Sequence, residues 1–407
     1  MSVMQLTISQ LGARGEGVAD DGRGGAIYVP YTLPGETVDA EVHGQRGRVR
    51  RVITSSTDRV EPECAHFGSC GGCLTQHWAR APYAAWKRQL VVDVLARRAL
   101  GGVPVAELLD AHGAGRRRVT LTVERGRAGF MAHRSHDLVA VERCPVLAPA
   151  LQAAPAVAVA LAKALGARKP LKVHVLASDS GLDCELIGVD DPALEARVKV
   201  AGVAETFDLS RVTASGDLLI ERRRPLLDAG GVAVTPPPGG FAQATAAGEQ
   251  ALAALVTGAL EGQPIVADLF CGWGAFALRL ARQSKVLAMD SERASIAALD
   301  AAVRGASGLK PVVTRVRDLM RDPLTAPEMK GVTGVVFDPP RAGAAAQAAE
   351  IVNATGITTV VGVSCDAGTF ARDAGVLVEG GFRLERVVPV DQFRHTAHVE
   401  LVGVFSR

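Results

Sequence analysis

The stretch PIVADLFCGWGAF, residues 264–276, decides the fold class of this chain. It joins a short, mostly apolar run of strand type to a glycine-containing turn. The same rhythm continues in KVLAMD, PVVTRV, GVTGVVFD and GITTVVGVS, which are separated by alanine-rich stretches of helix length. Such alternation of short strands and helices predicts a parallel sheet wrapped by helices.

The end of the chain breaks this alternation. RLERVVPV (383–390) and HVELVGVF (398–405) are joined by a loop too short for a crossover helix, so we expect them to pair antiparallel. Five parallel strands followed by an antiparallel hairpin are typical of a class I methyltransferase, an α/β Rossmann-like, doubly wound fold. We assign this domain to residues 236–407.

Short strands cut by turns fill the first 59 residues. QLTISQL, GAIYVP, ETVDAEV and RGRVRRVI alternate with period two, and the turn-rich ARGEGVADDGRGG and TLPGE separate them. Short, evenly spaced strands predict a small β-barrel of the oligonucleotide-binding kind over 1–59. A β domain without a ligand is the alternative at this point.

The segment 60–235 is predicted to form a central α+β domain. It holds a cysteine cluster, a helix near 79–100 and the strand-like runs RVTLTVE, LKVHVLA and DCELIGV. The turn TPPPGG (235–240) marks its end.

The cysteine cluster has the spacing of a metal site. Cys64, Cys70 and Cys73 follow C-x5-C-x2-C, and Cys144 comes far downstream in ERCP. Four thiolates can bind a zinc ion or a [4Fe-4S] cluster. A single C-x2-C knuckle and a proline after the last cysteine favour the iron–sulfur cluster, while zinc and the absence of any metal remain alternatives.

Composition narrows the class of partner and the compartment. The chain has 407 residues, is 48% hydrophobic and carries a formal charge of only +2, so overall charge does not indicate a nucleic-acid partner. Arginines do cluster near 46–51, 116–118 and 222–224, which suits either phosphate contacts or a solvated face. The start of the chain has no signal peptide, so we expect a cytoplasmic protein with no membrane partner. In that reducing compartment, seven cysteines indicate metal binding or catalysis rather than disulfides.

Residues at the ends of the first three parallel strands predict a cofactor site. Gly272 and Gly274 allow a sharp turn close to a ligand, and Asp290 closes the next strand, where it can accept hydrogen bonds from ribose hydroxyls. Asp318 follows the third strand and can hold an adenine amino group. NAD would require a fuller G-x-G-x-x-G, and ATP a Lys-Ser/Thr after the glycines, so S-adenosylmethionine fits best. A Rossmann fold without a cofactor is the alternative.

The stretch VGVSCDAGTFARD (361–373) places Cys365 at the carboxyl end of the fifth strand, where ligands lie in doubly wound folds. C5 of a pyrimidine is a poor nucleophile, and addition of a thiolate at C6 activates it. The adduct must then lose its C5 proton, for which Glu400 on the neighbouring strand offers a carboxylate. In FDPPRAG, Arg341 replaces the aromatic residue that methyltransferases of exocyclic amines place there, which disfavours that reaction. A buried structural thiol is the alternative for Cys365.

These motifs together resemble the RNA uracil-C5 methyltransferases, specifically the ribosomal members with a TRAM domain and a [4Fe-4S] cluster. C-x5-C-G-G-C-x2-Q-H, GGFAQ, DLFCGWG, DPPRAG, SCDAGTFARD and HTAHVE occur in the family's order over nearly the whole chain. The resemblance implies that Cys365 is the nucleophile, that Glu400 is the base and that the four cysteines hold the cluster. It also implies a set of cofactor-binding residues: Gln243, Phe270, Gly272, Asp290, Asp318 and Asp338.

Two positions depart from the family pattern. Ala275 stands where relatives often have an asparagine, and SCDAGT replaces the common S-C-N-P-x-T, but neither change removes a chemical role. We therefore expect methyl transfer from S-adenosylmethionine to C5 of a uridine in 23S rRNA, with RNA as partner and no obligate protein partner. Transfer RNA as substrate, or an RNA-binding protein without catalysis, are the alternatives.

Overall fold

An eight-stranded sheet dominates the C-terminal part of the computed structural model, which describes residues 2–407. Its strand order is β18-β17-β16-β19-β20-β22-β21-β6. The strands are β16 (Ile265–Leu269), β17 (Lys285–Asp290), β18 (Val312–Val316), β19 (Gly334–Phe337), β20 (Thr359–Ser364), β21 (Arg383–Asp391), β22 (Glu400–Ser406) and β6 (Leu109–Asp110). β16 to β20 pair in parallel, whereas β22 pairs antiparallel with both β20 and β21. The predicted five parallel strands and terminal hairpin are confirmed.

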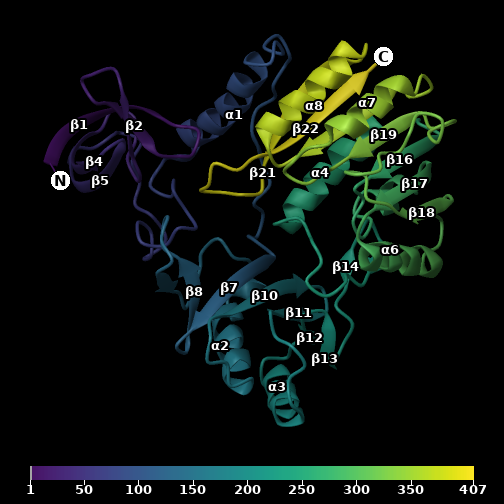
Figure 1. Cartoon of the computed structure of the whole chain (residues 1–407), viewed down its shortest axis with the longest axis horizontal. Helices are drawn as coiled ribbons and strands as arrows, with labels where there is room; N and C mark the ends of the chain where they lie inside the picture. Colours follow the sequence, from purple (N-terminus) through teal and green to yellow (C-terminus); the bar gives the residue numbers. More distant parts are fainter. Residues whose placement is uncertain (1) are drawn as a thin grey trace.

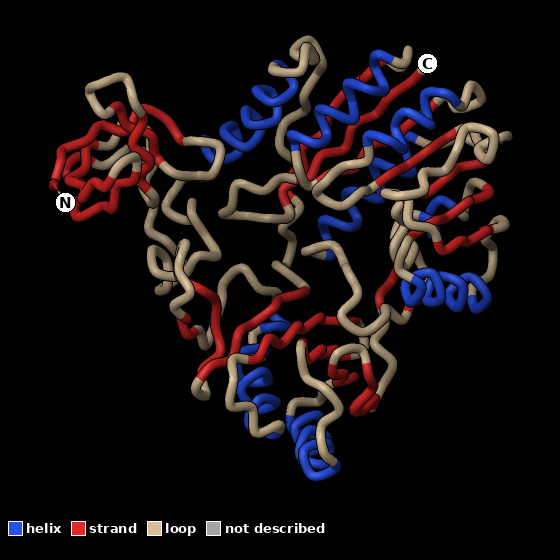
Figure 2. Tube along the Cα trace, in the orientation of Figure 1, coloured by secondary structure: helices blue, strands red, loops and turns tan. Residues whose placement is uncertain are grey.

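Helices cover both faces of this sheet (Figure 2). They are α4 (Ala246–Ala259), α5 (Ala277–Leu280), α6 (Arg293–Gly305), α7 (Ala345–Asn353) and α8 (Ala367–Glu379). Successive strand residues point to opposite faces, so Val336 packs with α4 and α6 in one core and Val335 with α7 and α8 in the other. No helix within residues 2–407 has both the length and the apolar content needed to cross a membrane.

A closed five-stranded barrel forms the N-terminal region, as predicted (Figure 1). It contains β1 (Ser2–Leu11), β2 (Gly17–Asp20), β3 (Ala26–Val29), β4 (Thr37–His43) and β5 (Arg46–Thr54). Aliphatic side chains such as Leu6, Ile8 and Val38 fill its interior. β2 lies inside the stretch that the sequence assigned to a turn, because four residues between glycines and aspartates are too few to show an alternating pattern.

The central region holds a seven-stranded sheet of order β13-β12-β11-β10-β7-β8-β9. Its strands are β7 (Arg118–Glu124), β8 (Arg127–Met131), β9 (Leu138–Ala140), β10 (Leu171–Ser178), β11 (Gly181–Ile187), β12 (Arg211–Ala214) and β13 (Asp217–Glu221). Helices α2 (Ala154–Ala164) and α3 (Leu194–Thr206) share one apolar core with this sheet. The two-stranded ribbon β14 (Leu227–Asp228) and β15 (Ala233–Val234) leads on to α4.

Helix α1 (Arg80–Ala96) ties the middle of the chain to the C-terminal sheet, since it packs against α8 and β21. Its Lys87 is fully buried, and Lys87 Nζ lies 2.6 Å from Asp391 Oδ1. The same ammonium donates to the carbonyl oxygens of Phe393 at 3.1 Å and His398 at 2.7 Å. The loop between β21 and β22, which extends toward the barrel in Figure 1, is therefore held by α1 just before β22 begins.

Candidate active site

A cavity of about 530 Å³ opens at the carboxyl edge of the parallel strands. Every cofactor-binding and catalytic residue predicted from the sequence lines it: Gln243, Phe270, Gly272, Asp290, Asp318, Asp338, Cys365 and Glu400. They come from the ends of the parallel strands, from the segment before α4 and from the first residue of β22. The doubly wound topology thus brings together residues that are far apart in the sequence.

The glycine-containing turn after β16 forms the floor of the cavity. Gly272 and Gly274 have φ values of +54° and +95°, and a Cβ added at Gly274 would lie 2.4 Å from Leu299 Cδ1. Asp290 fixes this turn, because its Oδ2 accepts a hydrogen bond from Gly272 N at 2.9 Å and its Oδ1 accepts one from Glu292 N at 2.8 Å. Ionised carboxylates have further acceptor positions, so Asp290 can still accept hydrogen bonds from a ligand in the cavity.

A strained backbone precedes this turn. Phe270 has a φ of +64°, a left-handed conformation that is unusual for a residue with a bulky side chain. Backbone strain of this kind is concentrated at ligand-binding sites, where the surrounding structure enforces it. The observation agrees with the predicted placement of Phe270 beside a cofactor.

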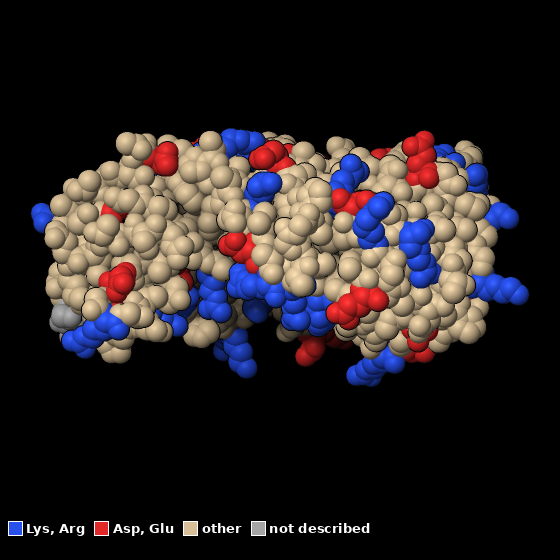
Figure 3. Space-filling view, turned by 90° about the horizontal axis from the view of Figure 1, so that it is seen from above, with Lys and Arg blue, Asp and Glu red and all other residues tan. Residues whose placement is uncertain are grey.

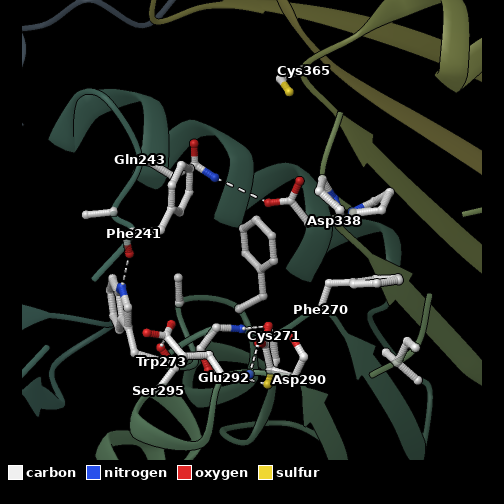
Figure 4. Close-up of a pocket in the computed structure, with 18 of the residues that line it drawn as sticks. Phe241, Gln243, Phe270, Cys271, Trp273, Asp290, Glu292, Ser295, Asp338 and Cys365 are labelled. Atoms are coloured by element: carbon white, nitrogen blue, oxygen red, sulfur yellow. Dashed lines mark hydrogen bonds between the residues drawn. The ribbon is translucent and has the colours of Figure 1, made fainter. Parts of the chain in front are cut away.

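The segment Phe241–Gln243 forms the opposite wall (Figure 4). Trp273 Nε1 donates to the Phe241 carbonyl oxygen at 2.7 Å, and Gln243 Nε2 donates to Asp338 Oδ2 at 3.3 Å. The Arg118 guanidinium carbon lies 4.6 Å from the centre of the Phe241 ring, whose side chain is 59% exposed. Arg118 is the first residue of β7, so the central sheet contacts the wall of the cavity through this side chain.

Cys365 directly follows β20 and is half-buried (Figure 4). Burial, together with the nearby Glu400 and Asp338 carboxylates, raises the pKa of its thiol, whereas Arg341 acts in the opposite direction. The Arg341 guanidinium is thus the cationic group that favours the thiolate at this position. The net effect of these groups is a raised pKa, which favours the neutral thiol.

Three carboxyl groups in or near the cavity, those of Asp338, Glu400 and Asp268, have raised pKa values. Burial and the Asp338 charge raise the pKa of Glu400 to about 8, and burial raises the pKa of Asp338 to about 7. Asp268 is completely buried, neither of its carboxylate oxygens has a hydrogen-bond partner within residues 2–407, and burial raises its pKa well above the usual range. These groups repel one another, so a cationic ligand would be favoured here.

The raised pKa of Glu400 gives a prediction for stability. An unfolded glutamate loses its proton near pH 4.5, whereas Glu400 in the folded chain holds its proton up to about pH 8. Stability should therefore fall as the pH rises between these values. We expect Glu400→Gln to unfold at least ~3 °C above the unmodified protein at pH 8 and at a similar temperature at pH 4, as measured by scanning calorimetry.

The exposed Glu261 provides a matched control for this experiment. Glu261→Gln removes one carboxylate from the surface and should unfold like the unmodified protein at both pH values. An equal gain for Glu400→Gln at pH 4 and pH 8 would show that burial of this carboxyl does not oppose its ionisation.

The four predicted cluster cysteines, Cys64, Cys70, Cys73 and Cys144, line a second cavity of about 120 Å³ between the segment before α1 and the central sheet. Gly71 N donates to the Met131 carbonyl oxygen at 3.0 Å, which fixes the C-x2-C loop on β8. Among residues 2–407, no group of three or more His, Cys, Asp or Glu side chains is arranged to hold a metal ion. The four thiols line one cavity, and the iron–sulfur cluster itself stays a prediction.

This cysteine site and the larger cavity are connected by the loop before β22. Leu74, next to Cys73, donates its backbone N–H to the His395 carbonyl oxygen at 2.8 Å. Arg116 lines the cysteine cavity, and its guanidinium carbon lies 5.6 Å from the centre of the Phe393 ring. The loop that leads to Glu400 thus rests on residues of the cysteine site.

Three residues at these sites were not identified individually from the sequence: Lys87, Arg118 and Gln392. Arg118 belongs to the arginine cluster at 116–118, and nothing in that cluster indicates which arginine reaches the cavity. Lys87 stands in an ordinary helix, and Gln392 is a lone amide in a short loop. The one local signal for Gln392 is its place directly after the last residue of β21, Asp391.

Comparisons with known proteins agree with this geometry. Residues 238–407 match the family described as tRNA (uracil-5-)-methyltransferase. An uncharacterized RNA methyltransferase of Caulobacter vibrioides is 43% identical over 417 aligned positions that cover 100% of both chains. A 23S rRNA (uracil(1939)-C(5))-methyltransferase of Chromohalobacter salexigens is 33% identical and matches 99% of this chain and 89% of its own length.

The same fold occurs in a solved structure over the full length of the chain. The crystal structure of Pyrococcus abyssi tRNA (uracil-54, C5)-methyltransferase in complex with S-adenosyl-L-homocysteine superposes with a TM-score of 0.76 at 22% identity and covers 99% of both chains. Given the identity and coverage of the sequence relatives, the chain belongs to the family of S-adenosylmethionine-dependent RNA uracil-5-methyltransferases.

Proposed function

We propose that this enzyme methylates C5 of a uridine in 23S rRNA through a covalent bond between Cys365 Sγ and C6 of the uracil ring. The observation that carries the mechanism is that Cys365 and Glu400 line the same cavity as the glycine turn and Asp290. One cavity can therefore hold the methyl donor and the target ring together. The relative that acts on 23S rRNA, which matches nearly the full chain, supports this substrate.

The residues of the cavity suit S-adenosylmethionine. Asp290 and Asp318 offer acceptors for ribose hydroxyls and an adenine amino group, and Phe270 and Phe276 offer apolar contacts. Asp338 lines the cavity, and the buried Asp268 carboxyl group lies close enough to Asp338 for the two charges to interact. When bound, the cofactor supplies an electrophilic methyl group on a positively charged sulfonium, and this charge favours ionisation of the nearby carboxyl groups.

Cys365 and Glu400 have complementary roles in the proposed reaction. The Cys365 thiolate forms a bond to C6, and the electron pair of the C5–C6 double bond moves toward the C4 carbonyl group to give an enolate whose negative charge is shared by O4 and C5. C5 then bonds to the methyl carbon as the bond from that carbon to the sulfonium sulfur breaks, and the sulfur keeps the electron pair in S-adenosylhomocysteine. Glu400 takes the C5 proton, the double bond forms again, and the bond between Sγ and C6 breaks to release the thiolate. Cys365 starts and ends this cycle as a thiolate, so the C5 proton on Glu400 is the one proton that the overall reaction releases, and Glu400 passes it to solvent.

The Asp290 carboxylate gives a direct test of the cofactor site. We expect Asp290→Ala to weaken binding of S-adenosylmethionine by roughly 1.5–3 kcal/mol, since it removes acceptors for the ribose and releases the glycine turn. Affinity for RNA should hardly change, because phosphate contacts dominate it. Titration calorimetry measures the first and filter binding the second, and unchanged cofactor affinity would remove Asp290 from the site.

The charge distribution supports RNA as the macromolecular partner. Lys and Arg side chains gather across the middle of the face in Figure 3, between the N-terminal barrel and the C-terminal domain. A groove of about 420 Å³ at the barrel is lined by Arg14, Arg46, Arg134 and Tyr28, which can contact phosphates and stack on a base. We propose that RNA lies along this path on its way to the active-site cavity.

We further propose that Cys64, Cys70, Cys73 and Cys144 hold a [4Fe-4S] cluster. All four thiols line one cavity. The single C-x2-C knuckle and the proline after Cys144 favour a four-iron cluster over a zinc ion. Arg116 and Arg143 also line this cavity and can balance the negative charge of bound thiolates. With four thiolates bound, the cluster would have no open iron position and would stabilise the structure.

The proposed iron–sulfur cluster can be tested by removing one of its cysteine ligands. We expect protein purified without air to contain iron and acid-labile sulfide and to absorb visible light, and Cys73→Ser to lose most of both. Cys184→Ser is the matched control, because Cys184 is fully buried in the core of the central sheet and should leave the iron content unchanged. Stoichiometric zinc without iron in anaerobically prepared protein would contradict the assignment.

The substrate is tested by mapping 5-methyluridine in RNA from a strain that lacks the gene. Mass spectrometry should show the loss of one site in 23S rRNA and its return with the intact gene, but not with a Cys365→Ala copy. Loss of a site in transfer RNA instead would overturn the choice of substrate. No loss at any site would favour an RNA-binding role without catalysis.

A further inference from the structure

Gln392 lies at the first position of the loop between β21 and β22, and its side chain is completely buried. Its Nε2 donates to Gln243 Oε1 at 2.7 Å and to Glu400 Oε1 at 3.2 Å. Its Oε1 accepts a long hydrogen bond, 3.4 Å, from the backbone N–H of Thr245. One amide thus touches the cofactor side of the cavity, the proposed base and the start of α4.

The direction of these hydrogen bonds is fixed by the groups around the amide. Both Nε2 hydrogens are used, one for each acceptor oxygen, and the Oε1 faces a backbone donor. A flipped amide would place its oxygen against Gln243 Oε1 and its NH₂ group against the Thr245 N–H. Gln243 continues the series, since its own Nε2 donates to Asp338 Oδ2. Two amides therefore connect the Asp338 and Glu400 carboxyl groups.

The surrounding structure holds Gln392 in place from both sides. The Asp391 carboxylate before it binds the buried Lys87 ammonium and accepts from Phe393 N at 3.1 Å. On the other side, a Cβ added at Gly248 would lie 2.7 Å from Gln392 Oε1, so glycine in the first turn of α4 leaves the room that this side chain occupies. The space at this position therefore fits a side-chain amide of this length.

We propose that Gln392 is a positioning residue for proton abstraction, and this inference rests on the proposed role of Glu400 as the base. Within residues 2–407, Gln392 Nε2 is the sole hydrogen-bond donor to the Glu400 carboxyl group. It occupies Oε1 and leaves Oε2 to face a uracil ring in the cavity that Glu400 lines. Through Gln243 it also ties the orientation of the base to the wall of the cofactor site.

The hydrogen bond also has an electrostatic effect. Donation by Gln392 lowers the pKa of Glu400, as do the positive charges of Arg118 and Arg341, whereas burial and Asp338 raise it. The charge of the same Glu400 carboxyl group raises the pKa of the Cys365 thiol. Without the Gln392 amide, Glu400 should ionise at higher pH, so elimination should require a higher pH.

Gln392→Met separates these effects from chain packing, because methionine has a similar length and no hydrogen-bond donor. Incubated with an unmodified 23S rRNA transcript, this variant should still add to C6 and transfer the methyl group but eliminate ~10-fold more slowly or worse. A methylated, covalent protein–RNA complex should accumulate, and the pH profile of its decay should shift upward. Gln283→Met, which removes an amide donor to the Thr257 carbonyl oxygen, is the matched control and should behave like the unmodified enzyme.

A double-mutant cycle distinguishes positioning from a structural role. In a Glu400→Gln background the base is already absent, so Gln392→Met should add little to the elimination defect. Equal losses in both backgrounds, or a Gln392→Met enzyme with unmodified decay and pH profile, would overturn the inference. Failure of the proposed function looks different: the unmodified enzyme would then form no adduct with the 23S transcript or with a transfer-RNA transcript run in parallel.

Discussion

Cys365→Ala should transfer no methyl group and should form no covalent complex with RNA. Without the thiolate, C6 has no nucleophile, and C5 then lacks the electron density to attack the methyl carbon. We expect a loss of at least ~10⁴-fold in turnover, the scale seen when a covalent nucleophile is removed. Release of tritium from C5-labelled uridine, methyl incorporation from radiolabelled cofactor and a shift on denaturing gels measure three different steps, and all three signals should disappear.

The buried Cys184 gives the matched control for the loss of a thiol. It lies in the core of the central sheet and does not line the active-site cavity, so Cys184→Ala should retain turnover. Cys365→Ala should also bind S-adenosylmethionine normally, because Asp290 and the glycine turn are untouched. Residual methylation by Cys365→Ala above the background of a reaction without enzyme would show that the thiol is not the nucleophile.

The sequence predicted the C-terminal fold well because each parallel strand and helix has its own local pattern. Short β-branched runs, separated by alanine-rich stretches of helix length, identify β16 to β20. The short loop between β21 and β22 requires the final hairpin. The same local patterns place Asp290 and Cys365 at strand ends, and the carboxyl ends of parallel strands meet at one edge. The sequence pattern alone therefore predicts that Asp290 and Cys365 lie at one cavity.

Other features depend on contacts that the local sequence does not contain. β6 has two residues and exists only because it pairs with β21 at the edge of the sheet. Lys87 looks like an exposed helix residue until α1 packs on β21 and buries it against Asp391. Gln392 gains its importance from Gln243 and Glu400 together, and Gln243 lies on a different segment. Residues whose role is created by packing are the ones that sequence patterns miss.

Glu400→Gln should stop the reaction one step later than Cys365→Ala. Glutamine keeps the size of the side chain and can still accept from Gln392, so addition to C6 and methyl transfer should proceed. The C5 proton then has no acceptor, and elimination should slow by ~10²–10⁴-fold, the usual contribution of a general base. A methylated protein–RNA complex should therefore accumulate and survive denaturing electrophoresis, with the label from the cofactor in the shifted band.

Two histidines near Glu400 are the other candidate acceptors for the C5 proton, and the structure favours Glu400 over both. The His395 ring packs against Tyr83 on α1, and burial lowers its pKa to about 4. His398 Nε2 lies 3.4 Å from Arg341 Nη2, and burial together with that cation lowers the pKa of His398 as well. Neither histidine lines the active-site cavity, whereas Glu400 does. Free turnover by Glu400→Gln would nevertheless transfer the role to His398, because its neighbour Arg341 lines the cavity. An inactive Glu400→Gln variant that forms no adduct would instead show that Glu400 acts before methyl transfer. One such role is in forming the Cys365 thiolate, because the charge of Glu400 raises the pKa of the Cys365 thiol.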